Sequence, residues 1–80
     1  MKIKSIGSNQ TEVITNIGVA ILVSYETPVA AVDLNNGTGT ALVTETNYSP
    51  TTTRHINNWL ATKSFSSKET RPQKFFDNLI

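Results

Sequence analysis

The chain has 80 residues, of which 38% are apolar and 16% charged, with a formal net charge of +1. This length suffices for one domain and leaves no room for separate catalytic and regulatory domains. A chain this short buries only roughly 60 to 65% of the surface that its unfolded form exposes, so its hydrophobic core is small. The sequence contains no cysteine, which excludes disulfides, a thiolate nucleophile and a cysteine-ligated zinc site.

No segment of the sequence indicates export or insertion into a membrane. Lysines occur near the start, but the apolar segment of a secretory signal does not follow them, so we expect no signal peptide. The longest apolar run, residues 17–23, is much shorter than the about 20 residues that cross a bilayer. We therefore expect a cytoplasmic protein with no membrane partner.

Alternating hydrophobicity predicts a strand over residues 17–25. Its odd positions are Ile, Val, Ile, Val and Tyr, whereas its even positions are Gly, Ala, Leu and Ser, which is the period of two typical of a strand. Thr27 and Pro28 should end this strand or introduce a bulge, because proline lacks the backbone donor of a sheet ladder. A further strand is predicted to follow over residues 29–34.

Turn-forming residues predict two hairpins. Residues 35–39 read Asn-Asn-Gly-Thr-Gly and tolerate positive φ, so they should turn the chain into a strand over residues 40–46. The same segment, taken from Asp33, is similar to a calcium loop, but it lacks the second carboxylate and the terminal glutamate that give such loops their affinity. Upstream, a weaker hairpin is predicted to join residues 3–6 to residues 11–15.

A change of period after residue 48 predicts a helix over residues 50–61. Ser49 is a favourable N-cap residue, and Pro50 suits the first helical position. An apolar stripe with the spacing i, i+3, i+4 is typical of a helix packed on a sheet, and here it consists of Ile56, Trp59 and Leu60.

The remaining residues, 62–80, are richer in lysine, arginine and phenylalanine than the first part of the chain. We expect residues 64–67 to form a linker. Residues 72–80 should add a short helix with a second apolar cluster, or else stay mobile until they meet a partner. The predicted organisation is a sheet-plus-helix domain over residues 1–61 and a basic C-terminal extension over residues 62–80, which packs on the domain or is mobile.

Together these elements predict an α+β fold. We expect a small antiparallel sheet or partly open barrel of four or five strands, with one main helix packed on it and a short C-terminal helix or tail. The predicted core consists of Ile17, Val19, Ile21, Val23, Val43, Ile56, Trp59 and Leu60.

Two segments of the chain resemble a family of small, uncharacterised proteins common in bacteriophage genomes. The first reads Tyr-Glu-Thr-Pro-Val-Ala over residues 25–30, and the second reads Thr-Thr-Thr-Arg-His-Ile-Asn-Asn-Trp-Leu over residues 51–60. The resemblance covers residues 23–60 and implies viral origin and one compact unit. It carries no established activity, and residues 1–22 and 61–80 look particular to this protein.

Few residues offer reactive chemistry. His55 is the single histidine and could serve as a general base or in recognition, but no activating serine or aspartate stands beside it in the sequence. We expect it instead to bond a neighbouring strand and to hold the helix on the sheet. The sequence predicts no enzyme activity, no catalytic residue, no cofactor and no metal.

Cations and aromatic rings in the last third of the chain predict a binding surface. Its candidate members are Arg54, His55, Lys63, Phe65, Lys68, Arg71 and Lys74. The first 50 residues carry two lysines against four acidic residues, whereas the last 30 carry five cations against two. Faces of opposite charge could steer the protein to a partner or to itself.

We therefore predict a non-enzymatic, phage-encoded protein that binds a host or viral protein in the host cytoplasm, with inhibition of a host defence as one outcome. Self-association is included in this prediction. The alternative is a single-stranded nucleic-acid-binding protein, in which the C-terminal cations contact phosphates and the rings stack on bases.

Overall fold

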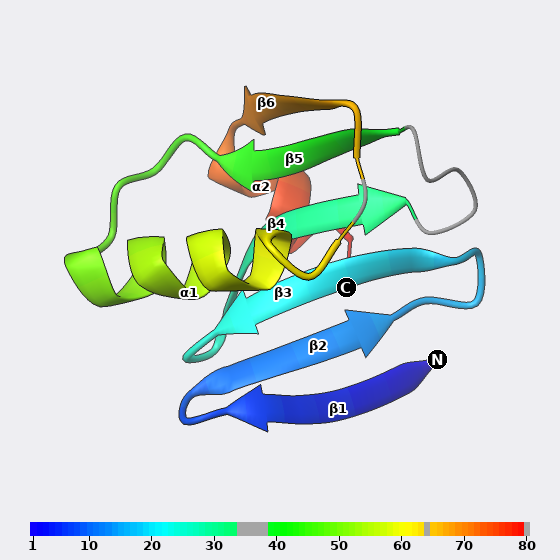
Figure 1. The fold of residues 1–80 in the computed structure, drawn as a ribbon, viewed down its shortest axis with the longest axis horizontal. Helices are drawn as coiled ribbons and strands as arrows, with labels where there is room; N and C mark the ends of the chain where they lie inside the picture. Colours follow the sequence, from blue (N-terminus) through cyan, green and yellow to red (C-terminus); the bar gives the residue numbers. More distant parts are fainter. Residues whose placement is uncertain (34–38, 64, 80) are drawn as a thin grey trace.

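The computed structural model describes residues 1–33, 39–63 and 65–79. They form a six-stranded sheet and two helices (Figure 1). The strands are β1 (Lys2–Gly7), β2 (Gln10–Ile14), β3 (Val19–Ser24), β4 (Thr27–Asp33), β5 (Thr40–Thr44) and β6 (Ser67–Arg71). Their order across the sheet is that of the chain, and all neighbours are antiparallel except β5 and β6, which are parallel.

The fold prediction is confirmed in its class and wrong in its number of strands. The protein is α+β with a mostly antiparallel sheet, but the sheet has six strands and is open, with β1 and β6 at its two edges. The strand that was not predicted is β6. Its residues are polar and almost all exposed, so no hydrophobic alternation indicates it, and its backbone pairs with β5.

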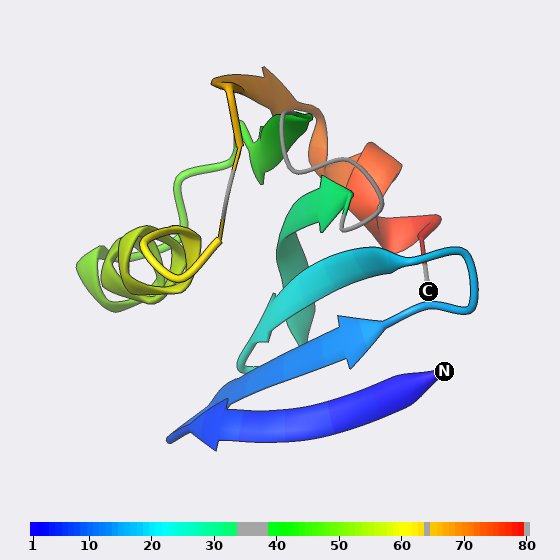
Figure 2. The same ribbon diagram turned by 45° about the vertical axis from the view of Figure 1, so that its right-hand side comes forward.

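The two helices cover opposite faces of the sheet (Figure 2). α1 (Pro50–Leu60) connects β5 to β6, because parallel neighbours require a crossover instead of a tight turn. α2 (Gln73–Asp77) follows β6 and contacts β4. This helix confirms the short C-terminal helix that was predicted within residues 72–80.

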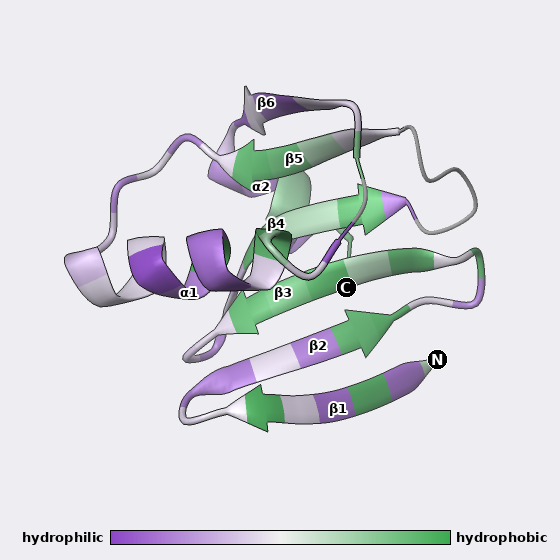
Figure 3. Ribbon diagram, viewed as in Figure 1, coloured by the Kyte–Doolittle hydropathy of each residue, from purple (hydrophilic) through white to green (hydrophobic). Residues whose placement is uncertain are grey.

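The central strands are buried on both faces, which creates two hydrophobic clusters. On β3, Ala20 and Leu22 belong to the first cluster, under α1, whereas Ile21 packs with Phe76 of α2 in the second cluster. Strands β3 to β5 are accordingly mainly apolar along their length (Figure 3). The sequence interpretation placed only the odd positions of β3 in the core, and so it missed the face that carries the main helix.

The predicted core is confirmed in part. Its buried members are Ile21, Ile56, Trp59 and Leu60. Its partly buried members are Val19, Val23 and Val43. The prediction for Ile17 is wrong, since this residue is 74% exposed. The strand begins only at Val19, and Gly18, with a φ of 83°, turns the chain just before it.

The predicted hairpins are present as antiparallel pairs, β1 with β2 and β4 with β5. Between β3 and β4 the register shifts between Leu22 and Val23, and Val23 pairs with Pro28. An irregularity was expected beside the proline, but Thr27 and Pro28 belong to β4 itself. The turn predicted for residues 35–39 falls outside the described residues, except for Gly39.

The turn between β3 and β4 holds Tyr25 in the left-handed region, with a φ of 59°. Such a conformation is uncommon for a bulky residue. Two contacts accompany it: the backbone N–H of Tyr25 donates to the carbonyl oxygen of Asn9 at 2.7 Å, and its ring lies 5.9 Å from that of His55 between centroids. These contacts join two neighbouring turns and the helix at one end of the sheet.

α1 begins as predicted and ends one residue earlier than predicted. Ser49 Oγ accepts a hydrogen bond from the backbone N–H of Thr52 at 3.2 Å, and Pro50 occupies the first turn. The buried positions follow the spacing i, i+3, i+4, i+7, i+8 and are Thr52, His55, Ile56, Trp59 and Leu60. Neither helix in the described part of the chain is long and apolar enough to cross a bilayer.

Replacing Phe76 by alanine should destabilise the protein by about 3 to 5 kcal/mol, because removal of this fully buried ring leaves a cavity between α2 and the sheet. Phe75 is the matched control, since its ring lies 5.2 Å from that of Phe76 yet is 37% exposed. We expect Phe75→Ala to cost much less. Chemical denaturation measures both variants, and equal losses would show that α2 does not close the second cluster.

Candidate binding groove beside the edge strand

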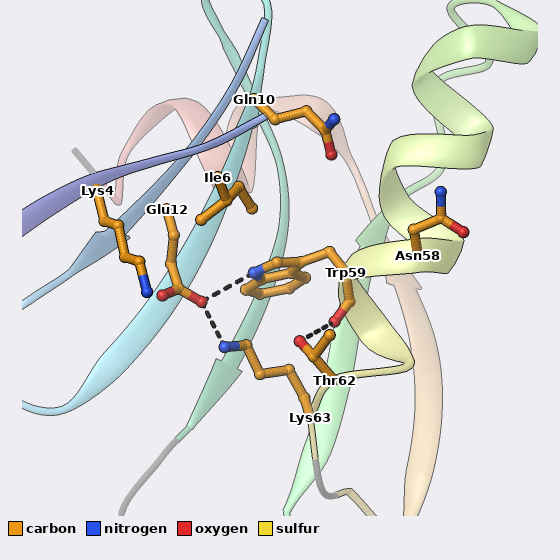
Figure 4. Close-up of a pocket in the computed structure, with 8 residues that line it drawn as sticks. All are labelled: Lys4, Ile6, Gln10, Glu12, Asn58, Trp59, Thr62 and Lys63. Carbon is orange, nitrogen blue, oxygen red and sulfur yellow. Dashed lines mark hydrogen bonds and ion pairs between the residues drawn. The ribbon is translucent and has the colours of Figure 1, made fainter. Parts of the chain in front are cut away.

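A groove lies where α1 leaves the edge of the sheet uncovered. The helix packs over the central strands through the first cluster. The floor of the groove comes from β1 and β2, and its wall comes from the second half of α1 and the residues after it (Figure 4). The cavity measures about 400 Å³ and is lined by Lys4, Ile6, Gln10, Glu12, Asn58, Trp59, Thr62 and Lys63.

Glu12 on β2 is the most buried charged residue of the groove, only 7% exposed. Its Oε1 accepts a hydrogen bond from Trp59 Nε1 at 2.9 Å and forms an ion pair with the ammonium of Lys63. Lys63 Nζ also lies 5.3 Å from the centre of the Trp59 ring, a distance at which a cation and an aromatic face attract. These three side chains, the Glu12 cluster, join β2 to the C-terminal end of α1.

The Glu12 cluster holds its carboxylate in the charged form. Burial alone would raise the pKa of the Glu12 carboxyl, but hydrogen bonds from Lys63 and Trp59 and the charges of Lys63 and Lys4 outweigh burial, so the pKa lies below its ordinary value of 4.5. Such a carboxylate is a weak base at neutral pH and is poorly matched to proton transfer. The arrangement suits attachment of the helix better than acid–base chemistry.

β1 forms the outer rim of the groove, and all six of its residues are exposed. Lys4 stands opposite Glu12, and Ile3 stands opposite Val13, so successive side chains of β1 point to the α1 face and to the α2 face in turn. Hydrophilic and hydrophobic residues alternate visibly along this strand (Figure 3). Ile3 is 71% exposed, so it adds a large area of apolar surface to this edge of the sheet.

The first half of α1 is attached to the sheet by His55, as predicted. Its Nδ1 lies 2.8 Å from Ser24 Oγ, and the same Oγ lies 3.3 Å from Thr52 Oγ1. Both His55 and Ser24 are buried. Among the described residues, no carboxylate is hydrogen-bonded to the imidazole, so the orienting group of a hydrolase triad is missing there.

The cations predicted to form one binding surface come from several different elements. Lys63 lines the groove. Arg54, Lys68 and Lys74 are exposed on α1, β6 and α2 respectively, and the two helices lie on opposite faces of the sheet (Figure 2). Arg71, at the end of β6, pairs with Glu69 at 3.1 Å. The structure therefore disperses these side chains over several surfaces.

The aromatic rings expected beside those cations mostly pack inward. Phe65 packs against the first cluster, Trp59 is 3% exposed and Phe76 is fully buried. His55, the remaining predicted member of the binding surface, is engaged with Ser24. These four rings therefore offer little exposed face on which bases could stack.

Sequence reasoning named Lys63 as a candidate binding residue and Trp59 as a core residue, but it did not identify the groove or its other lining residues. Lys4 and Glu12 are brought opposite each other by the pairing of β1 with β2. Trp59, which bonds Glu12, lies 47 residues after it in the sequence. One signal is present in the sequence: Glu12 stands next to Val13 and Ile14 in a predicted strand. An acidic residue in a strand that becomes buried requires a donor or cation from another element.

Comparison with protein families covers nearly the whole chain. Residues 1–78 match a family of unknown function, DUF8033. The chain belongs to this family. The match corrects the expectation that residues 1–22 and 61–78 are particular to this protein, since the family unit includes β1, β2, β6 and α2. No curated protein and no solved structure gives a match.

Acidification should destabilise the protein through Glu12. The pKa of Glu12 is lower in the folded protein than its ordinary value. The ionised carboxylate therefore stabilises the fold fully at a pH above the pKa of Glu12 in the unfolded chain. This stabilisation is lost as the pH falls through the pKa of Glu12 in the folded protein. We expect the free energy of unfolding to decline below a pH of about 4.5, and Glu12→Gln to flatten this decline. Denaturant titrations at several pH values measure it. Glu26, which is exposed, provides the control, and equal slopes for Glu12→Gln and Glu26→Gln would contradict the role of the cluster.

The contact between His55 and Ser24 should contribute to stability as a pair. A double-mutant cycle with Ser24→Ala and His55→Ala should give a coupling energy of about 1 kcal/mol, as expected for a buried hydrogen bond. The control cycle combines Ser24→Ala with Arg54→Ala, because Arg54 is exposed on the same helix. Equilibrium unfolding supplies all the free energies. Coupling of similar size in both cycles would mean that the contact does not hold the helix.

Proposed function

We propose that this protein is a non-enzymatic binding protein that engages another protein through β1. The observation that carries the proposal is the composition of this edge strand, whose residues are all exposed and include Ile3 at 71%. An edge strand presents backbone groups that can pair with a further strand. Exposed aliphatic side chains add apolar area for docking.

The partner that we propose is a host or viral protein in the cytoplasm of the host cell, with inhibition of a host defence as the expected consequence. The support is the resemblance of residues 23–60 to small proteins encoded by bacteriophages. A protein that acts by occupying a partner's surface needs an exposed, complementary face and no reactive group. Eighty residues are sufficient for such a face.

The non-enzymatic part of the proposal is supported by the engagement of the two side chains best suited to proton transfer. His55 is buried against Ser24, and Glu12 is held by Trp59 and Lys63. Both therefore attach α1 to the sheet. Single-stranded nucleic-acid binding, the alternative, has less support, because the predicted cations are dispersed and most of the rings beside them are buried.

The proposal is tested by capturing the partner with the tagged protein and with Ile3→Asp. We expect the wild-type protein to capture a specific protein, and we expect Ile3→Asp to weaken that binding on the order of tenfold, because it removes exposed apolar area at the strand edge. Affinity capture with mass spectrometry identifies the partner, and purified components then give the dissociation constant.

The control is Tyr48→Asp, since Tyr48 is 46% exposed but lies on the connection between β5 and α1. This variant should bind as the wild type does. Failure to capture any protein above background would count against a binding function. Equal binding by Ile3→Asp would remove β1 from the site, and salt-sensitive binding of a labelled oligonucleotide would favour the nucleic-acid alternative.

A further inference from the structure

We propose that β1 is extended by an acidic strand of the partner, in which carboxylates stand opposite Lys2 and Lys4 and an aliphatic side chain stands opposite Ile3. This inference rests on the proposed function and specifies the chemistry of the partner. The recognised sequence is then acidic, aliphatic, acidic at three consecutive positions.

The alternation of β1 defines this pattern. Lys4 stands opposite Glu12, which is bonded to Trp59 of α1, so Lys4 and its neighbour two residues away, Lys2, point to the α1 face. Ile3 stands opposite Val13 of the second cluster and points to the α2 face. A strand added beside β1 places its side chains on the same two faces in the same alternation.

The charges at this edge favour an acidic partner. In the described part of the chain, no ion pair involves Lys2 or Lys4, and the ammonium of Lys63 is already paired with Glu12. The groove beyond Lys4 also presents the amides of Gln10 and Asn58 (Figure 4). Opposite charges at facing positions of paired strands stabilise the pair, so carboxylates on an added strand would meet two exposed lysines, of which Lys4 also faces Glu12, and hydrogen-bond donors of the groove.

A second copy of the chain fits this edge less well. If β1 paired antiparallel with another β1 and the pairing were centred on Ile3 or Lys4, a lysine would face a lysine, which is destabilising. The other edge of the sheet, β6, is also a poor candidate, because it has no large apolar side chain and its Arg71 is paired with Glu69. The edge at β1 is thus suited to a different, acidic chain.

The experiment selects binders from a library of random ten-residue peptides, with the full chain immobilised through its C-terminus so that β1 is accessible. We expect the selected peptides to carry Asp or Glu at alternate positions around an aliphatic residue. Amide hydrogen exchange should show slower exchange in β1 when a selected peptide is bound and no change in β6. N-methylation of alternate peptide amides should abolish binding, because it removes the hydrogen bonds of the added strand.

The protein variants are Lys2→Glu and Lys4→Gln, each of which should weaken a selected acidic peptide by roughly threefold to tenfold. Lys68→Glu is the matched control on the opposite edge, where Lys68 is also exposed, and it should leave the affinity unchanged. Circular dichroism verifies that all variants are folded. Lys4→Gln also removes one of the charges that lower the pKa of Glu12. Lys2 stands opposite Ile14, so Lys2→Glu is the variant that tests the edge apart from the Glu12 cluster.

Four results would each overturn the inference. The selected peptides lack alternating acidic residues, or no peptide binds. Alternatively, Lys68→Glu weakens peptide binding as much as the β1 variants do, or the bound peptide slows amide exchange outside β1. The proposed function can survive that result, because capture of the natural partner that depends on Ile3 would still place binding at β1. Loss of both the acidic pattern and the dependence of capture on Ile3 would reject the inference and the function together.

Discussion

The attachment of α1 to β2 through the buried carboxylate of Glu12 is the constraint on which the rest of the structure depends. A charged side chain that is only 7% exposed is costly to bury unless it is paired and hydrogen-bonded. Trp59 and Lys63 provide both interactions, from the end of α1 and from the segment after it. The cluster ties this end of the helix, which packs over the central strands, to the neighbouring strand β2 through side chains. It thereby sets the width of the groove and leaves β1 uncovered.

The other end of α1 is fixed by the contact of His55 with Ser24 at the end of β3. Between these two polar contacts, Ile56 and Leu60 pack into the first cluster. Apolar packing is non-directional, whereas hydrogen bonds require defined distances and angles. In a chain whose core is small, the apolar stripe supplies most of the stabilisation, and the polar contacts at its two ends specify the direction in which the helix lies on the sheet.

How much of this arrangement could be predicted from the sequence depends on the range of each interaction. α1 was predictable because its N-cap, its proline and its stripe are local features. β6 was not, since a polar edge strand is held by backbone pairing with β5, and a crossover leaves no tight turn between the two strands. The groove was not predictable either, because Glu12 and Trp59 are 47 positions apart and neither segment indicates its partner. The role of His55 was predicted in part: its attachment to a strand was expected, but Ser24 was not identified as its partner.

Because the proposed binding surface lies on β1, the residues proposed to set the affinity for a partner are largely different from those that stabilise the fold. Residues of β1 are exposed on both faces, so substitutions there change the edge without opening a cavity. Residues of the groove wall are different, because Trp59 belongs to the first cluster and also bonds Glu12. A change at Trp59 alters both the shape of the groove and the stability of the fold, and typical per-residue stabilities give a chain of this length only about 4 to 12 kcal/mol. Specificity can therefore vary most freely along β1, whereas the groove beside it is restricted to side chains that also hold the helix in place.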